Sequence, residues 1–308
     1  MFKKITDDIL KFTVKYPSGM GEVNCYLIKG ENGYTVIDTG TNEREAKQAW
    51  TKAIESGLRI EKVVLTHTHE DHIGSASWLQ KEYGIPVIVS QLGYKEMLHR
   101  LKMTTEQFNQ LITKYGGPEL PADFRDDKSI FEFQPDAFFD KDEKIQLGND
   151  YYDAIWTPGH AFDHFCFYNK EKRIMIVGDH ILKDVSPVIG LWSGREENPL
   201  PKYLDSLESL KEYSVELALP GHGENINYFQ DRINDLQNRH KTRLKQVYDS
   251  IRNSEKTAIE ICREFYEDSN LLMNISTLMA ILTRLFYLES YGKVERNVRD
   301  GMITFQAK

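Results

Sequence analysis

The stretch from Thr66 to His72 reads THTHEDH, so three histidines and Asp71 fall within six positions. An apolar run over residues 63–65 precedes it and a helical pattern begins at Ile73, which together indicate a strand, a tight loop and a helix start. Ionisable groups at such a place cost free energy unless they are paired or bound to a metal. Histidine with aspartate suits zinc, iron or manganese, whereas calcium prefers oxygen ligands. The stretch therefore predicts a metal site, and the alternative is a solvated polar loop.

Three later loops place further metal-ligand side chains just past an apolar run. They are TPGH at 157–160, GDH at 178–180 and LPGHG at 219–223. Functional groups collect at such positions because strand ends are rigid and loops can aim a side chain. With the first stretch they give seven candidate metal ligands: His67, His69, Asp71, His72, His160, Asp179 and His222. Seven are too many for one catalytic zinc, which takes three, and suit two ions that share a bridging carboxylate.

Two adjacent divalent cations predict hydrolysis. They lower the pKa of a shared water from about 15.7 toward 7, so the attacking group would be a hydroxide that bridges the metals. The expected cofactors are two divalent ions, with zinc favoured and iron or manganese as alternatives. The sequence contains no GxSxG motif that would supply a protein nucleophile instead. Asp71 and His180 are the candidate catalytic residues; His164 and His180 could pass a proton to the leaving group or be packed histidines.

The residues around these loops alternate between strand and helix patterns. Asn32-Gly33 between two apolar runs predicts a hairpin, and the alternation indicates a layered α/β architecture. Residues 91–140 interrupt it with two expected short helices, the second capped by Thr105. We expect this insertion to be either a lid over the site or a peripheral decoration.

From about residue 225 the pattern becomes helical. Three helices are expected, over 225–253, 257–266 and 276–291. A short hairpin that turns at Asp300-Gly301 follows them, and this order is the outline of a winged-helix module. The expected domains are a catalytic domain over 1–225, with the helical insertion at about 91–140, and a C-terminal helical, winged-helix-like domain over 226–308.

Composition places the chain among ordinary soluble globular proteins. Of its 308 residues, 40% are apolar and 28% are charged, which allows a sizeable core. The formal net charge of −8 argues against a protein that grips nucleic acid non-specifically. Three well-separated cysteines indicate buried thiols in a reducing compartment, and no run reaches the roughly 20 apolar residues of a membrane span. We expect a cytoplasmic enzyme with no membrane partner.

The order of the motifs resembles that of the metallo-β-lactamase superfamily. The signature HxHxDH stands here over residues 67–72, and TPGH, GD and PGHG follow in the family's order. The resemblance implies an α/β (α+β) fold, the αββα sandwich, with metals at the strand ends. It implies one metal held by His67, His69 and His160, a second held by Asp71, His72 and His222, and Asp179 as the bridge.

The same resemblance indicates which branch of the superfamily the chain is most similar to. Asp179 stands where antibiotic-destroying lactamases carry a cysteine, so the ligand set is similar to that of glyoxalase II and its relatives. His69 in place of a glutamate speaks against the flavodiiron branch. GDHIL at 178–182 and the helical tail resemble the two-domain lactamase-β-like hydrolases, but we find no basic residues that match the glutathione site of glyoxalase II. Asp38 matches the family's early aspartate and would orient a ligand or cap a turn.

Two functions from different classes fit these residues. The first is hydrolysis of a small ester, thioester or lactone, with a small-molecule substrate; the second is a metal-dependent nuclease that cleaves RNA or DNA. Residues 240–308 hold 11 Lys/Arg against 9 Asp/Glu and lack the basic patch of a nucleic-acid binder, so we favour the first. The C-terminal segment would then cover the site or form a homodimer contact, and Arg195 would hold a substrate anion or lie on the surface.

Overall fold

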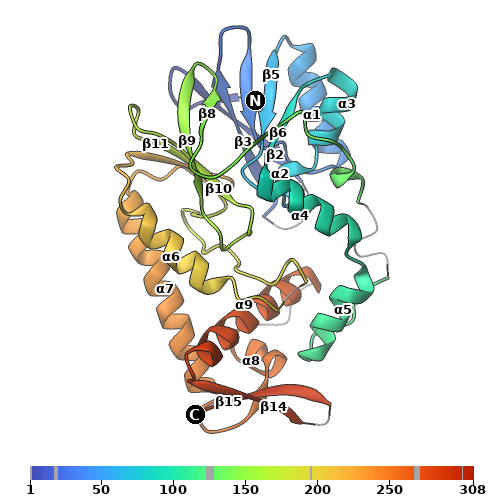
Figure 1. Ribbon diagram of the computed structural model, residues 1–308, viewed down its shortest axis with the longest axis vertical. Helices are drawn as coiled ribbons and strands as arrows, with labels where there is room; N and C mark the ends of the chain where they lie inside the picture. The colour runs from blue at the N-terminus through green and yellow to red at the C-terminus, as the bar shows by residue number, and fades with distance from the viewer. Residues whose placement is uncertain (1, 17–19, 123–127, 195, 267–270, 300) are drawn as a thin grey trace. The chain divides into compact units, whose positions relative to one another are not determined.

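The computed structural model describes residues 2–16, 20–122, 128–194, 196–266, 271–299 and 301–308. Figure 1 shows the elements in chain order. The chain forms two compact units. The first contains Met1–Leu101, Asp127–Pro187 and Lys211–Arg232, and the second contains Lys102–Asp126, Val188–Leu210 and Ile233–Lys308. The sequence predicts one boundary near residue 225, whereas here two earlier segments group with the C-terminal residues.

The first unit contains a seven-stranded sheet. Its strands, in spatial and chain order, are β1 (Phe2–Lys4), β2 (Ile9–Lys15), β3 (Glu22–Lys29), β4 (Tyr34–Ile37), β5 (Ile60–Val64), β6 (Val87–Ser90) and β7 (Ala137–Phe139). Strands β1 to β4 are antiparallel neighbours, and the Asn32-Gly33 turn joins β3 to β4 as predicted. Strands β4 to β7 run parallel, which requires crossover connections between them.

A five-stranded sheet forms a second layer of this unit. Its strands are β8 (Lys144–Leu147), β9 (Asp150–Trp156), β10 (Phe165–Asn169), β11 (Ile174–Gly178) and β12 (Leu217–Pro220). Strands β8 to β11 form an antiparallel meander, and β12 pairs parallel to β11. Every residue of β10 and β11 is buried, which explains why both strands are nearly continuous apolar runs.

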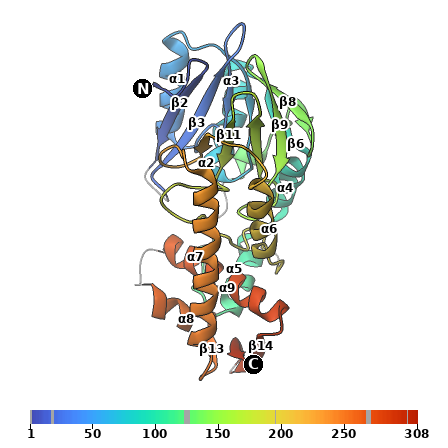
Figure 2. The same ribbon diagram turned by 90° about the vertical axis from the view of Figure 1, so that its left-hand side faces the viewer.

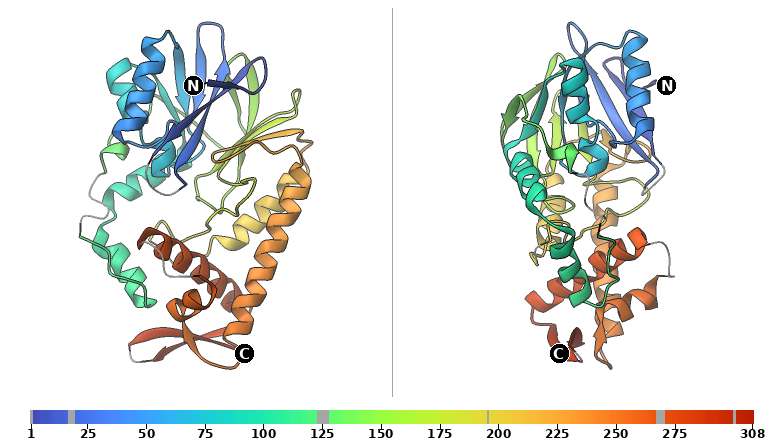
Figure 3. Two further views of the ribbon diagram at one scale, coloured as in Figure 1. Left: turned by 180° about the vertical axis from the view of Figure 1, so that it is seen from behind. Right: turned by 90° about the vertical axis from the view of Figure 1, so that its right-hand side faces the viewer.

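The two sheets face each other across an apolar core. Ile28 and Val64 of the first sheet belong to one buried cluster with Phe165 and Phe167 of the second. Helices on the other face of the first sheet pack around Trp50. The described helices of this unit are α1 (Arg44–Glu55), α2 (Glu70–Ile73), α3 (Ala76–Tyr83), α4 (Gln91–Lys102) up to Leu101, the 3-10 helix η1 (Ser129–Phe131) and the first turn of α7, which begins at Phe229. Figure 2 and the right panel of Figure 3 show the first sheet between α1 and the second sheet, so the predicted α/β sandwich is confirmed.

The second unit is mainly helical and ends in a three-stranded sheet. Its elements are α5 (Thr105–Lys114), α6 (Leu200–Leu210), most of α7 (Phe229–Ser250), β13 (Lys256–Thr257), α8 (Ala258–Phe265), α9 (Leu271–Ser290), β14 (Val294–Arg299) and β15 (Met302–Ala307). The order in the sheet is β13-β15-β14. The core joins Phe108 of α5 to Leu278 of α9 and Phe305 of β15, so residues far apart in sequence share one apolar cluster.

Two details of residues 91–140 differ from the sequence-based prediction. Thr104 rather than Thr105 caps α5, because Thr104 and Gln107 form a reciprocal capping box. The insertion also contains β7, which pairs with β6. A role of this segment as a lid stays a prediction.

The C-terminal hairpin is present, and its classification as part of a winged helix stays a prediction. Asp300, in the expected turn, and Arg195 lie outside the described residues. Within the described ranges, we find no helix with the length and apolar character needed to span a bilayer.

Candidate metal centre

The seven predicted metal ligands lie at the ends of four strands of the first unit. Those of the THTHEDH stretch occupy the loop after β5 and the first turn of α2. The other three are His160 after β9, Asp179 after β11 and His222 after β12. The structure brings all seven together in two groups of potential ligand atoms.

One group is His67, His69 and His160, and the other is Asp71, His72, Asp179 and His222; within each group the ligand atoms lie within 4.8 Å of one another. The resemblance implies the same division of the other six residues, with Asp179 shared between the groups; that these residues bind metal stays a prediction. Asp179 Oδ2 lies 3.5 Å from His160 Nε2 in the first group. The same oxygen lies 3.4 Å from His72 Nε2 and 3.2 Å from His222 Nε2 in the second. One carboxylate therefore contacts both groups, which is the position predicted for the bridging ligand.

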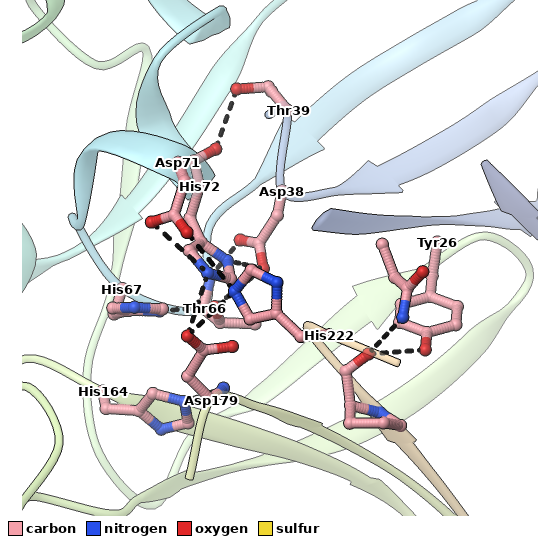
Figure 4. A network of polar contacts seen from close by, with 12 residues as sticks. Tyr26, Asp38, Thr39, Thr66, His67, Asp71, His72, His164, Asp179 and His222 are labelled. Carbon is pink, nitrogen blue, oxygen red and sulfur yellow. Dashed lines mark hydrogen bonds and ion pairs between the residues drawn. The ribbon is translucent and has the colours of Figure 1, made fainter. Parts of the chain in front are cut away.

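Hydrogen bonds at Nδ1 orient three of the histidines, and Figure 4 includes the partners of His67 and His72. His72 Nδ1 lies 2.9 Å from Asp38 Oδ2, and His222 Nδ1 contacts a backbone carbonyl of β3. Because Thr66 Oγ1 donates to Asp38, the 2.9 Å contact between Thr66 Oγ1 and His67 Nδ1 requires the imidazole to donate. Each Nδ1 therefore carries a hydrogen, and each Nε2 turns toward the centre of the ligand groups, as metal-binding imidazoles do.

Asp38 links the loop after β4 to the first ligand loop. It is 2% exposed, and its Oδ1 and Oδ2 accept from the backbone N–H and the hydroxyl of Thr66, both at 2.8 Å. Its φ of 61° is in the left-handed region, where aspartate is tolerated better than most residues. Asp38 therefore orients His72, which is one of the two roles left open by the sequence, and also holds Thr66 at the start of the ligand loop.

The carboxylates of the centre are ionised. Burial alone would raise the pKa of Asp179, but His222 and His72 outweigh burial and hold that pKa well below its usual value. The pKa of Asp71 is lowered in the same way, again against burial. Burial would lower the pKa of His222, but Asp179 and Asp71 raise it to about 10. A divalent cation would therefore displace a proton from His222 when it binds.

The all-histidine group has different electrostatics, and both groups contain buried ligand atoms without a hydrogen-bond partner among the described residues. Burial lowers the pKa of His67 and of His69, and neighbouring imidazoles lower both further, so these rings are neutral and able to bind a cation. In the described part of the chain, His67 Nε2, His72 Nε2 and Asp179 Oδ1 are buried without a hydrogen-bond partner. Such atoms mark a place for an ion. The nitrogen and oxygen donors fit two divalent transition-metal ions.

Sequence reasoning missed two side chains that contact the ligand-bearing loop. Tyr16, at the end of β2, donates from Oη to Asp71 Oδ2 at 3.0 Å. Asp163 is 1% exposed, and its Oδ2 accepts from the backbone N–H and the hydroxyl of Thr68 at 2.9 and 2.8 Å. Burial raises the pKa of Asp163 to about 6. No local pattern marks Tyr16, whereas Asp163 follows the TPGH motif closely enough to have been considered.

His164 and His180 lie behind the centre. His164 Nε2 accepts the backbone N–H of Asp179 at 3.2 Å, and its Nδ1 lies 2.8 Å from Thr157 Oγ1. His164 therefore holds the backbone of Asp179 in place. The His180 ring is fully buried 5.5 Å from that of His164, and burial lowers its pKa to about 3. The catalytic roles predicted for His180 and for Asp71 stay predictions.

Two glycines allow the ligand loops to approach each other. A Cβ at Gly221 would collide with Asp179 Oδ1 and lie 2.8 Å from His72 Cε1. A Cβ at Gly178, where φ is +46°, would lie 2.6 Å from His164 Nε2. Close approach therefore explains the glycines that precede Asp179 and His222 in the GDH and PGHG motifs.

Comparison with known proteins assigns the family. A family model described as the metallo-beta-lactamase superfamily matches residues 18–222. The chain belongs to this superfamily. Membership confirms the predicted family and fold and, at the level of reaction class, the prediction of a metal-dependent hydrolase.

Relatives of the chain are distant but extend over most of it. Probable metallo-hydrolase YqjP of Bacillus subtilis is 27% identical over 85% of this chain and 86% of its own length. Hydroxyacylglutathione hydrolase GloC of Haemophilus influenzae is 25% identical over 68% of this chain and 89% of its own. Atrochrysone carboxyl ACP thioesterase of Aspergillus fumigatus is 25% identical over 75% of this chain and 61% of its own length. A metallo-beta-lactamase family protein of Thermus thermophilus, 25% identical, superposes with a TM-score of 0.87 over 99% of this chain and all of that one.

Proposed function

We propose that the chain is a dinuclear metal-dependent hydrolase of small acyl compounds, and that it prefers acyl thioesters to simple esters and lactones. The observation that carries the proposal is the position of Asp179, whose one oxygen contacts both ligand groups. A shared carboxylate supports two ions held side by side. The metal identity is proposed as zinc, with iron or manganese as alternatives, because histidine and carboxylate suit all three.

The names of two relatives support the thioester class. Both a hydroxyacylglutathione hydrolase and an acyl-carrier-protein thioesterase are among them. A thioester combines an electrophilic carbonyl with a good leaving group, so cleavage needs activated water more than a strong acid. This matches a centre whose buried His180 is neutral.

Each group of residues would have its own role in hydrolysis. The two ligand groups would hold the cations, which when bound polarise a carbonyl oxygen and acidify water. Asp38 and Tyr16 hold His72 and Asp71 in place, so the ligand atoms are fixed before a substrate arrives. Asp71 and Asp179 remain ionised and offset the charge of the cations.

A substrate panel tests the proposal directly. Purified protein would be offered a p-nitrophenyl ester, an acyl thioester, a homoserine lactone and single-stranded RNA. We expect kcat/KM to be higher for the thioester than for the lactone, because a thiolate leaves without protonation and the alkoxide of an opened lactone does not. The p-nitrophenyl ester, whose phenolate also leaves without protonation, shows how much of the rate depends on the leaving group alone. In His67→Ala, kcat/KM should fall by more than roughly 100-fold, because removal of a residue that only hydrogen-bonds to a metal ligand already costs about 10–100-fold.

His99→Ala serves as the matched control, because His99 lies on α4 and belongs to neither ligand group. It should keep the activity of the natural sequence. Cleavage of RNA alone, lost in His67→Ala and kept in His99→Ala, would replace the proposal with the nuclease alternative.

A further inference from the structure

The second unit contains a group of basic side chains that the metal centre does not use. His240 and Arg243 lie one turn apart on α7, and Arg284 lies on α9. Tyr266 follows the end of α8. All four residues belong to the second unit, so this cluster can be described without reference to the first.

Arg284 is a largely buried cation without a carboxylate partner. Its Nη1 donates to the backbone carbonyl of Ala280 in its own helix, and its Nε has no hydrogen-bond partner in the described part of the chain. No ion pair joins its guanidinium to any acidic residue that the structure describes. Burial and, to a smaller extent, the nearby Arg243 lower the pKa of Arg284 to about 10. The charge of Arg243 therefore acts on Arg284.

His240 is an even more completely buried polar group. It is 2% exposed, and neither ring nitrogen has a hydrogen-bond partner among the described residues. Its ring meets the Tyr203 ring edge-on, with centroids 5.2 Å apart. Burial lowers the pKa of His240 to about 3, and Arg284 contributes to this. The ring is therefore neutral, with one N–H to donate and nothing described to receive it.

Arg243 brings a second guanidinium to the same helices. Its Cζ lies 5.4 Å from the centre of the Tyr266 ring and 5.7 Å from that of Phe265, so both rings hold it by cation–π contact. Its side chain also donates to Gln246 at 2.9 Å. The described residues again provide no carboxylate for it.

Buried cations and unused N–H groups cost free energy unless a partner satisfies them. A native structure that keeps such groups points to an ion or water at that place. Guanidinium groups match the planar geometry of carboxylate and phosphate oxygens. We propose that His240, Arg243 and Arg284 form a binding site for an oxyanion, namely the carboxylate or phosphate group of a ligand. This site is separate from the proposed hydrolase function and does not depend on it.

The Nε–Hε signal of Arg284 provides a direct test. Full-length protein labelled with ¹⁵N-arginine would be titrated with inorganic phosphate and, separately, with acetate, against chloride at the same ionic strength. The signal is assigned by its loss in Arg284→Lys, which keeps the charge. We expect it to shift saturably at millimolar concentration with phosphate, with acetate or with both, and the stronger of the two identifies the class of ligand. The Nε–Hε signal of Arg100, whose charge acts on the ligand residue His69, shows in the same titration whether the anion also binds near the metal centre.

Variants distinguish a site from general charge attraction. Arg284→Gln and, independently, Arg243→Gln should each weaken binding of the preferred anion by about tenfold or more in calorimetry. Lys245→Gln is the matched control, because its side chain lies on the same helix and is 76% exposed. It should change the affinity less than twofold.

Three results would overturn the proposal. The first is an Arg284 signal that moves no more with phosphate or acetate than with chloride. The second is an equal loss of affinity in Lys245→Gln. The third is a shift of the same signal without added ligand in a Glu267→Gln/Asp268→Asn variant, because the chain's own acids would then be the anion.

Discussion

At the scale of single residues, the centre depends on side chains that stand behind the ligands. Asp38 orients His72, Tyr16 contacts Asp71, and Asp163 holds the backbone between two ligand histidines. Groups in such positions commonly change metal affinity 10–100-fold when they are removed. Tyr16 and Asp163 lead to separate predictions, because one acts on a ligand and the other titrates.

Tyr16→Phe removes the hydroxyl that donates to Asp71 and nothing else. We expect the metal affinity of the ligand group that contains Asp71 to fall by about tenfold, within the range for groups that hydrogen-bond to ligands. Competition with a fluorescent chelator measures this affinity. Tyr151→Phe is the matched control, because Tyr151 is 64% exposed and should leave both affinities unchanged. Equal affinities in the two variants would show that the Tyr16 hydroxyl does not support the site.

Asp163→Asn should remove a pH dependence of stability. The pKa of Asp163 is raised from 3.8 to about 6, so between these values the folded chain keeps a proton that the unfolded chain releases. Stability contributed by this residue therefore falls as pH rises from about 4 to 6, by about 3 kcal/mol in total, and is constant above. Urea unfolding of metal-free protein at pH 5 and pH 7 measures it. From pH 5 to pH 7, the free energy of unfolding of the variant should rise by about 1 kcal/mol relative to that of the natural sequence. If the difference between the two proteins is the same at both pH values, the raised pKa is contradicted.

At the scale of elements, strands β5, β9, β11 and β12 each deliver ligands from the loop that follows them. The sequence was sufficient for these loops because each is a local pattern of an apolar run followed by ligand side chains, with a glycine directly before the ligand in the last three. It was not sufficient for the contact of Tyr16 with Asp71 or of Asp163 with Thr68, since these join residues 55 and 95 positions apart. No short pattern encodes such distant contacts.

Gly221→Ala tests how closely the loop after β12 must approach the centre. A methyl group there meets Asp179 and His72, so we expect overpacking to cost about 1–3 kcal/mol of stability and to lower metal content. Gly84→Ala is the contrasting variant: its φ is +65°, but nothing lies near the added carbon. It should lose about 1 kcal/mol through backbone strain alone and keep its metal. Full metal content in Gly221→Ala would show that the close approach is unnecessary.

At the scale of the whole molecule, the chain builds two units from interleaved segments. Phe108 and Leu191 come long before the C-terminal helices in sequence, yet they share their apolar cluster. Apolar periodicity reveals that a helix has a buried face but does not say which distant helix covers it. For this reason the predicted boundary near residue 225 could not include residues 102–126 and 188–210 in the second unit.

The function proposed for the whole molecule requires two cations side by side, with Asp179 between them. Elemental analysis of protein purified without chelator measures this most directly, with Asp179→Asn and the control His99→Ala treated in parallel. We predict two transition-metal ions per chain in the natural sequence and in His99→Ala, and fewer in Asp179→Asn. Protein that contains no such metal and takes none up, or an Asp179→Asn variant that keeps two ions, would contradict a shared dinuclear centre.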